Sequence, residues 1–235
     1  MNEINSNNDV SFSGNVSLAN QIVRNFHGAG VCKLINLICE KFFTFSGRAE
    51  IKSSKFNEMK VSGSTSLVES TAGKILSSGR FQATNCPRLQ EITGSGFVGL
   101  DRCPEVGEVV TTGGFALKAS KVSGNVTIQG REASIDDSTI AGTLECADKI
   151  VKISNSSIQK IIVKPIHENS GPRWEFRIWS FSISFGSPLE GQEQVIELSG
   201  EKCRIGSIAF EEGAVGKVLV KAGASVPIVT GLDVK

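Results

Sequence analysis

The sequence has few of the residues that build common catalytic and metal centres. It holds only two histidines in 235 residues, His27 and His167, and neither lies in a serine or cysteine motif, so a catalytic triad is not expected. The six cysteines form no Cys-x-x-Cys pair and match no zinc spacing. Phosphate-binding loops and dinucleotide fingerprints are also missing. We therefore predict no metal, no cofactor and, on balance, no enzyme.

Neither an excess of charge nor a long hydrophobic run is present. The chain has 25 basic and 24 acidic residues, so its net charge of +1 gives no general attraction to nucleic acid or acidic membranes. No apolar run reaches the ~18 residues needed to cross a bilayer. Residues 1–9 are polar and lack the apolar core of a secretory signal. We expect a cytoplasmic bacterial protein without a membrane span, with export by a signal-independent route left open.

What the sequence does contain is a repeat of about 17 residues. One column of apolar residues, called here the lead column, recurs at steps of 16 to 18: Val10, Phe26, Phe43, Met59, Ile75, Ile92, Val109, Val126 and Leu144. Four residues after each of the first eight stands a glycine, and at the ninth stands Asp148. Four residues further on comes a second column: Leu18, Leu34, Ile51, Leu67, Ala83, Leu100, Leu117 and Ser134. A fixed period of this length is typical of a repeat architecture.

Alternation of apolar and polar residues within each unit favours strands over helices. One strand of ~6–9 residues with two bends returns the chain to a point ~4.8 Å above its start, the strand spacing in a sheet. The sequence therefore predicts an all-β fold, a single parallel β-helix with about 16–18 residues per coil and about 9–12 coils. Right-handed winding is expected because crossovers between parallel strands are almost always right-handed.

Two kinds of corner are predicted. The glycine column predicts one, where the chain turns inward or leaves no room for a side chain, and it includes Gly47, Gly63, Gly79, Gly96, Gly113 and Gly130. A second column of mostly Asn, Asp and Ser predicts a left-handed turn: Asn20, Asn36, Ser53, Ser70, Asn85, Arg102, Ser120, Asp137 and Asn155. Cys86 and Cys103 lie 17 residues apart and are expected to stack. We favour two reduced thiols there, although their separation could suit a disulfide.

The period divides the chain into four segments. Residues 1–9 form a polar N-terminal tail or cap, 10–164 the main solenoid, and 195–235 the terminal coils and C-terminal cap. A one-residue slip is expected near Asp148 to Ile153. Between the two solenoid parts, residues 165–194 break the period and predict a hairpin-like insertion. Its aromatic residues are candidates for partner binding, since exposed aromatic clusters mark contacts, although such a strand could also simply cover the core: Trp174, Trp179, Phe181 and Phe185.

Carboxylates are the weak candidates for catalysis. Glu91 and Glu108 lie 17 residues apart in one outward column and are expected to stack ~5 Å apart, close enough to couple. Long parallel β-helices that cleave acidic sugars use acids on one wall. Lys74 and Lys160 share this column, however, so it is also explained as a solvated wall of mixed charge.

Short phrases within 56–164, such as Val122-Ser-Gly-Asn-Val-Thr-Ile and Ile140-Ala-Gly-Thr-Leu, resemble those of bactofilins, the polymer-forming bacterial scaffold proteins. The resemblance implies a cofactor-free scaffold that associates end to end. This chain departs from the pattern in having more coils and a tryptophan-bearing insertion.

Two hypotheses of function follow. The first is a structural or interaction solenoid that binds itself or a protein partner through its walls or ends. The alternative is a carbohydrate-binding or carbohydrate-cleaving β-helix that uses the stacked wall carboxylates.

Overall fold

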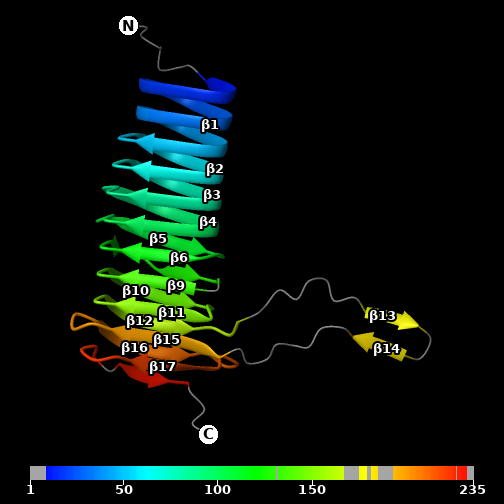
Figure 1. Ribbon diagram of the computed structural model, residues 1–235, viewed down its shortest axis with the longest axis vertical. Coiled ribbons are helices and arrows are strands. Elements are labelled where there is room, and N and C mark those ends of the chain that lie inside the picture. Colours follow the sequence, from blue (N-terminus) through cyan, green and yellow to red (C-terminus); the bar gives the residue numbers. More distant parts are fainter. Residues whose placement is uncertain are drawn as a thin grey trace.

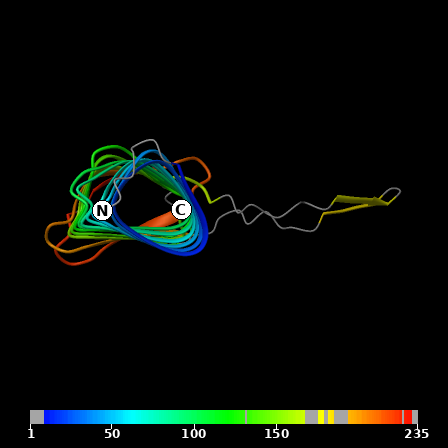
Figure 2. The same cartoon turned by 90° about the horizontal axis from the view of Figure 1, so that it is seen from above.

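The computed structural model describes residues 9–130, 132–166, 193–225 and 227–231, and the backbone of 175–178 and 181–184. Every regular element in these residues is a β-strand, and the strands stack as a parallel solenoid of about ten turns (Figure 1). Seen along its axis, the solenoid has successive coils lying over one another (Figure 2). The predicted all-β parallel β-helix is therefore confirmed.

The strands follow the coils in chain order. Strand β1 winds through the first coils without interruption, whereas later coils are divided at their corners. The bounds are β1 (Val10–Lys52), β2 (Lys55–Val68), β3 (Thr71–Thr84), β4 (Arg88–Asp101), β5 (Val106–Thr111), β6 (Phe115–Lys118), β7 (Lys121–Val122), β8 (Val126–Ile128), β9 (Glu132–Asp136), β10 (Thr139–Cys146), β11 (Ile150–Ser154), β12 (Ser157–Val163), β13 (Glu175–Ile178), β14 (Phe181–Ser184), β15 (Gln194–Ser199), β16 (Arg204–Phe210), β17 (Gly216–Val220) and β18 (Ile228–Thr230).

The register between coils reproduces the columns of the sequence. Strand β3 pairs in parallel with β2 and β4, so that Ile75 lies between Met59 and Ile92. Gly79 lies in the same way between Gly63 and Gly96. In these strands the backbone hydrogen bonds therefore run from coil to coil along the axis.

The glycine corner has a steric cause. Gly79 has φ +117°, which side-chain-bearing residues rarely adopt, and a Cβ there would collide with the carbonyl oxygen of Gly63 in the coil above. Gly113 departs from the left-handed conformation, but a Cβ there would still meet the Gly96 carbonyl. Close backbone approach between coils is thus the property that this column shares.

At the second corner, two adjacent positions of each coil have separate roles, one as a left-handed turn and the next as a buried side chain. The sequence indicated a single column there. Left-handed backbone occurs at Glu69 and Ala119, so the expectation for Ser70 and Ser120 was wrong by one residue in these two coils. Ser70 and Ser120 instead point into the solenoid and are buried. They belong to a buried corner row with these members: Ser54, Ser70, Cys86, Cys103, Ser120, Ser138 and Ser156.

The corner row satisfies backbone groups inside the core. The Ser120 hydroxyl accepts a hydrogen bond from the Cys103 N–H at 2.9 Å and donates to the Lys118 carbonyl at 2.6 Å. Cys86 and Cys103 occupy serine positions of this row, and both are unpaired thiols, as we favoured from the sequence. Contact with Cys103, together with burial, raises the pKa of the Cys86 thiol.

The phase slip occurs one coil earlier than predicted. Phe115 and Leu117 lie opposite Ala133 and Ile135, which are buried, whereas Ser134 points outward. The extra residue therefore lies between Gly130 and Ala133, and the coil of Asp148 to Ile153 inherits the new register. The apparent continuation of the alternation through Glu132 and Ser134 concealed the change of face.

Stacked aromatic rings fill the interior of the first coils, whereas later coils are mostly aliphatic with single phenylalanines such as Phe81 and Phe115. Phe26 and Phe43 stack with ring centroids 4.8 Å apart, and Phe56 meets Phe43 edge-on at 5.0 Å. Farther along, the lead column is filled by fully buried Ile75, Ile92 and their successors. The inward residues of successive coils form one continuous core.

The insertion leaves the solenoid after β12, and the coils resume at β15. Strands β15 and β16 pair with β11 and β12, so the stack continues across the break. The side chain of Gln194, which is 1% exposed, donates to the carbonyls of Lys164 at 3.0 Å and Asp148 at 3.3 Å. Strands β13 and β14 form a separate antiparallel pair, as the hairpin prediction required.

We predict that Gly79→Ala lowers the free energy of unfolding by at least about 3 kcal/mol, because it combines an unfavourable φ with a backbone collision. Gly14→Ala is the matched control, since Gly14 has φ +100° but no atom within 4 Å of an added Cβ. That variant should lose only the strain, about 1–3 kcal/mol. Chemical denaturation measures both, and equal losses would contradict the role of coil-to-coil contact.

Ser120→Ala should lower the free energy of unfolding by about 1–3 kcal/mol, because it leaves the buried Cys103 N–H without its acceptor. Cys86→Ser installs the residue that neighbouring coils use at this corner, and it should change stability by less than about 1 kcal/mol. Thermal unfolding of the two variants tests the serine-like role of the thiols. A larger loss for Cys86→Ser than for Ser120→Ala would argue against it.

Candidate functional site

The two wall carboxylates are adjacent, as the repeat predicts. Glu91 on β4 lies opposite Glu108 on β5, and Lys74 precedes them in the same column. The Lys74 ammonium lies 3.1 Å from the Glu91 carboxylate, and both side chains are about half exposed. Exposed pairs of this kind contribute at most about 1 kcal/mol. The geometry is that of a solvated charged wall, and a catalytic role for this pair stays a prediction.

Other ion pairs also join neighbouring coils. Arg88 contacts Glu105 at 3.0 Å, Lys152 contacts Glu132 at 2.7 Å, and Lys164 contacts Glu145 at 2.6 Å. In each of these three pairs an acid of one coil lies beside a base of a neighbouring coil, so the two charges offset each other. His27 is exposed on the second coil, whereas His167 lies outside the described residues. Within the described part of the chain, no group of three potential metal ligands comes together.

The candidate partner-binding aromatics belong to the insertion. Trp174, Trp179 and Phe185 lie outside the described residues, and Phe181 is defined only as the backbone partner of Ile178 in the β13–β14 pair. Partner binding by the insertion therefore stays a prediction.

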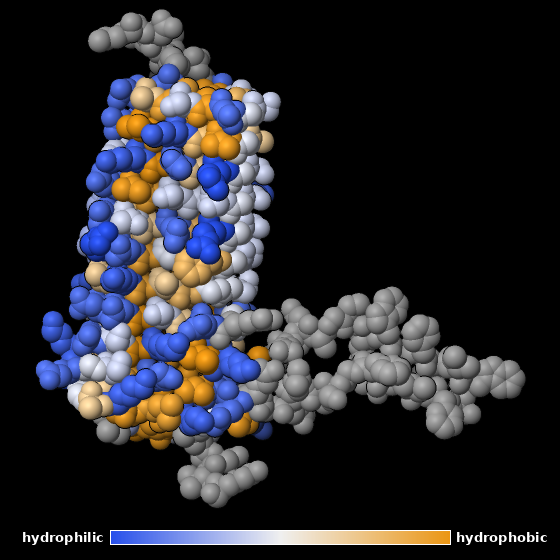
Figure 3. Space-filling model, in the orientation of Figure 1, coloured by the Kyte–Doolittle hydropathy of each residue, from blue (hydrophilic) through white to orange (hydrophobic). Residues whose placement is uncertain are grey.

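The C-terminal end of the solenoid exposes hydrophobic side chains that the sequence reasoning missed. Strands β17 and β18 are the last of the 16-stranded sheet, and each has a described partner on one side only. Val220 lies opposite the buried Leu198, yet is 38% exposed because no described coil covers it. Figure 3 shows hydrophobic surface at this end of the solenoid. Nearby exposed apolar residues are Val215, Leu219 and Ile228.

The N-terminal end has the same property. Val10, Phe12, Val16 and Leu18 face the core but are only partly buried. In the next coil, Phe26, Cys32 and Leu34 are completely buried. Among the described residues, both ends of the solenoid therefore present an uncovered set of core side chains, here called the end rungs.

Asp148 is a buried carboxylate in the glycine column. It is 1% exposed, and its Oδ1 accepts a hydrogen bond from the Gly130 N–H, while Oδ2 has no partner among the described residues. Burial raises the pKa of Asp148 to about 6, against the opposing effect of the Gly130 hydrogen bond. Burial thus destabilises the charged form in the folded protein, and the carboxyl loses its proton only as the pH rises through about 6.

Among the residues that the structure describes, no helix has the length and apolarity for a membrane span. No protein-family model matches the chain, and comparisons with curated proteins and with solved structures find no match. The resemblance to bactofilins therefore rests on the short phrases and on the solenoid architecture alone.

We predict that Asp148→Asn stabilises the protein at pH 7 by about 2–3 kcal/mol and removes part of its pH dependence. Because the pKa is higher in the folded state than in the unfolded chain, the folded state binds more protons between about pH 4 and 6. Wild-type stability from this group therefore increases as the pH falls through that window, and asparagine abolishes the increase while keeping an acceptor for Gly130.

Urea denaturation at pH 4, 5, 6 and 7 measures this difference. The matched control is Asp137→Asn, which changes an exposed carboxylate at a left-handed position that asparagine tolerates. Equal pH profiles for both variants would contradict a special role of Asp148.

Proposed function

We propose that this chain is a structural β-solenoid whose copies associate end to end. The observation that supports this most strongly is the pair of uncovered end rungs. A structural solenoid needs its core covered at each end, and a second copy supplies uncovered apolar side chains and strands of the same direction.

Backbone geometry favours the same occupant. The outer edges of β17 and β18 have no partner among the described strands, and such edges are templates for pairing with another chain. A first coil placed against them would continue the parallel sheet at the ~4.8 Å spacing of strands. This contact joins different surfaces of two identical copies, so it is head-to-tail and does not close. Repetition would produce a filament.

Side-chain chemistry supports the contact as well. Val218 and Val220 continue the columns of Val16 and Leu18, and Val229 continues the column of Val10. In the contact these side chains would meet and replace water by apolar surface. The resemblance to bactofilins also favours end-to-end association. By contrast, cleavage of carbohydrate by Glu91 and Glu108 gains no support, because Glu91 is already paired with Lys74 on an exposed wall.

The proposal predicts that the wild-type protein gains mass with concentration in light scattering and forms filaments in electron micrographs. Val220→Lys should weaken this association at least tenfold, because a buried lysine at the joint would be unpaired. Ile38→Lys is the matched control, since Ile38 is similarly exposed, at 40% against 38%, but lies on the wall.

Thermal unfolding of both variants verifies that they remain folded. A wild-type protein that stays monomeric at several hundred micromolar would rule out this function. An equal loss of self-association in Val220→Lys and Ile38→Lys would show that the end rungs do not cause the association.

A further inference from the structure

Two adjacent coils place a thiol where the coils on either side place a buried serine. Cys86 and Cys103 are both 0% exposed, and both are free. They hold the same position in their coils, since Thr84 pairs with Asp101 two residues earlier. The two thiols contact each other. Equivalent Cα atoms of adjacent strands are ~4.8 Å apart, which lies within the range of ~4.4–6.8 Å that disulfides span.

The backbone holds this corner less firmly at the two thiols than in other coils. In five other coils, the residue after the corner-row member donates its N–H to the row carbonyl of the preceding coil: Thr71 to Ser54, Lys121 to Cys103, Thr139 to Ser120, Ser157 to Ser138 and Arg204 to Ser156. Pro87 and Pro104 follow the two cysteines, and proline has no N–H. The carbonyls of Ser70 and Cys86 therefore do not receive this hydrogen bond.

The missing hydrogen bonds make local opening easiest where the thiols lie. Regions with fewer backbone hydrogen bonds between neighbouring elements open at a lower free energy than the rest of a structure. The residues next to each thiol in the chain are already exposed: Asn85, Pro87, Arg102 and Pro104. A small displacement of this corner therefore brings Cys86 and Cys103 to solvent, which a buried thiol needs in order to react.

We propose that Cys86 and Cys103 form a reversible disulfide that joins their two coils when the protein meets a small-molecule disulfide oxidant. One cysteine thiolate attacks a sulfur of the oxidant, which forms a mixed disulfide and releases one small thiolate that takes up a proton. The second cysteine gives up its proton and attacks the protein sulfur of the mixed disulfide, which releases the second small thiol. The cysteine pair thus loses two electrons and two protons, and the oxidant gains them.

The disulfide supplies a link between coils at the place where Pro104 removes one. It would make the solenoid more stable under oxidising conditions, because the bond closes a loop in the unfolded chain. The pair belongs to two inner coils of a single chain, so the proposal does not rest on end-to-end association.

The experiment incubates the native full chain in mixtures of reduced and oxidised glutathione, stops exchange with acid and alkylates the remaining thiols. Trypsin cleaves after Arg80, Arg88, Arg102 and Lys118, so the two cysteines leave on separate peptides, 81–88 and 103–118. Mass spectrometry should find these two peptides linked, with the loss of two hydrogen atoms. The other cysteines are internal controls and should stay alkylated, because none has a cysteine at the same position of a neighbouring coil: Cys32, Cys39, Cys146 and Cys203.

Two variants separate the thiol pair from the weak corner. Cys86→Ser should abolish the linked peptide, and oxidised glutathione should raise the unfolding temperature of the wild type by about 5 °C but leave that of Cys86→Ser unchanged. Pro104→Ala restores an N–H that can donate to the Cys86 carbonyl, and it should slow disulfide formation at least about fivefold. Pro165→Ala is the matched control, since it removes a proline from another corner.

Three outcomes would overturn the proposal. One is the absence of the linked peptide after native incubation in excess oxidised glutathione. Another is linkage that appears only in urea, which would show that the folded corner does not open. The third is oxidation of Pro104→Ala at the wild-type rate. Val220→Lys should form the disulfide as the wild type does, so failure of self-association and failure of this proposal are distinguishable.

Discussion

Close contact between the backbones of successive coils is the constraint on which the rest of this structure depends. At the glycine corner each coil lies so near the previous one that a Cβ on Gly79 would collide with the Gly63 carbonyl. At the opposite corner, serine and cysteine side chains satisfy the backbone groups that turn into the core, as Ser120 does for Cys103. With both corners held, each coil must lie directly over its neighbour. The register then follows, and residues that recur in the sequence become continuous columns in space.

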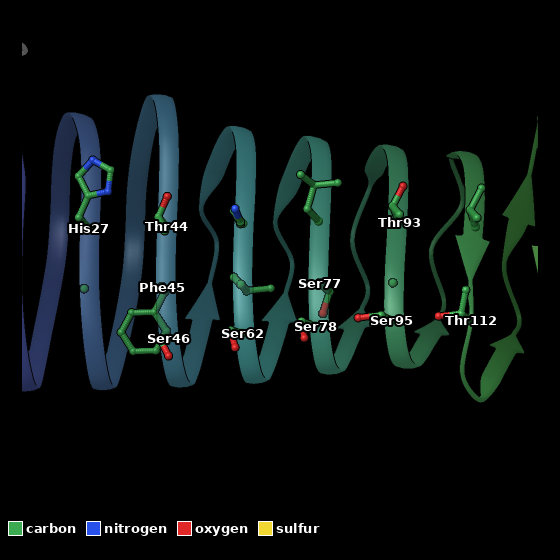
Figure 4. A pocket seen from close by; sticks show the side chains of 16 residues that line it. His27, Thr44, Phe45, Ser46, Ser62, Ser77, Ser78, Thr93, Ser95 and Thr112 are labelled. Atoms are coloured by element: carbon green, nitrogen blue, oxygen red, sulfur yellow. The ribbon is translucent and has the colours of Figure 1, made fainter. Parts of the chain in front are cut away.

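Columns decide what kinds of surface such a protein can have. Lys74, Glu91 and Glu108 form a line of mixed charge because they share a phase, and adjacent opposite charges neutralise each other. Ser62, Ser78 and Ser95 share another phase and produce a linear array of hydroxyls along the axis, beside a groove in this wall (Figure 4). At the ends the columns stop, and there the same regularity favours another copy of the coil itself.

Much of the fold was predictable from the sequence because one residue type, glycine, is required wherever coils approach closely. The positions that were predicted wrongly involve choices between adjacent residues. At Glu69 and Ser70, one residue takes the left-handed turn and the next enters the core, and composition favoured the serine for the turn. At Ala133, the one-residue slip was not recognised, because apolar and polar residues continue to alternate by chance across it. The end rungs and the groove were not predicted. The end rungs depend on what covers Val220, and the groove depends on how deep the surface is between outward-facing columns. A repeat period in the sequence carries information on neither.

The position of the insertion follows from the same constraint. In the ninth coil, Asp148 replaces the corner glycine, and its carboxylate binds the Gly130 N–H. Close stacking of one backbone on another is thereby replaced by a side-chain contact. In the following coil, the chain departs after Lys164, and Gln194 bridges the Lys164 and Asp148 carbonyls where it returns. A polar side chain thus supplies the hydrogen bonds that an uninterrupted backbone would have made. An added segment is accommodated at this corner because its two ends are held by Gln194, whereas at Gly79 the same interruption would remove the contact that sets the register.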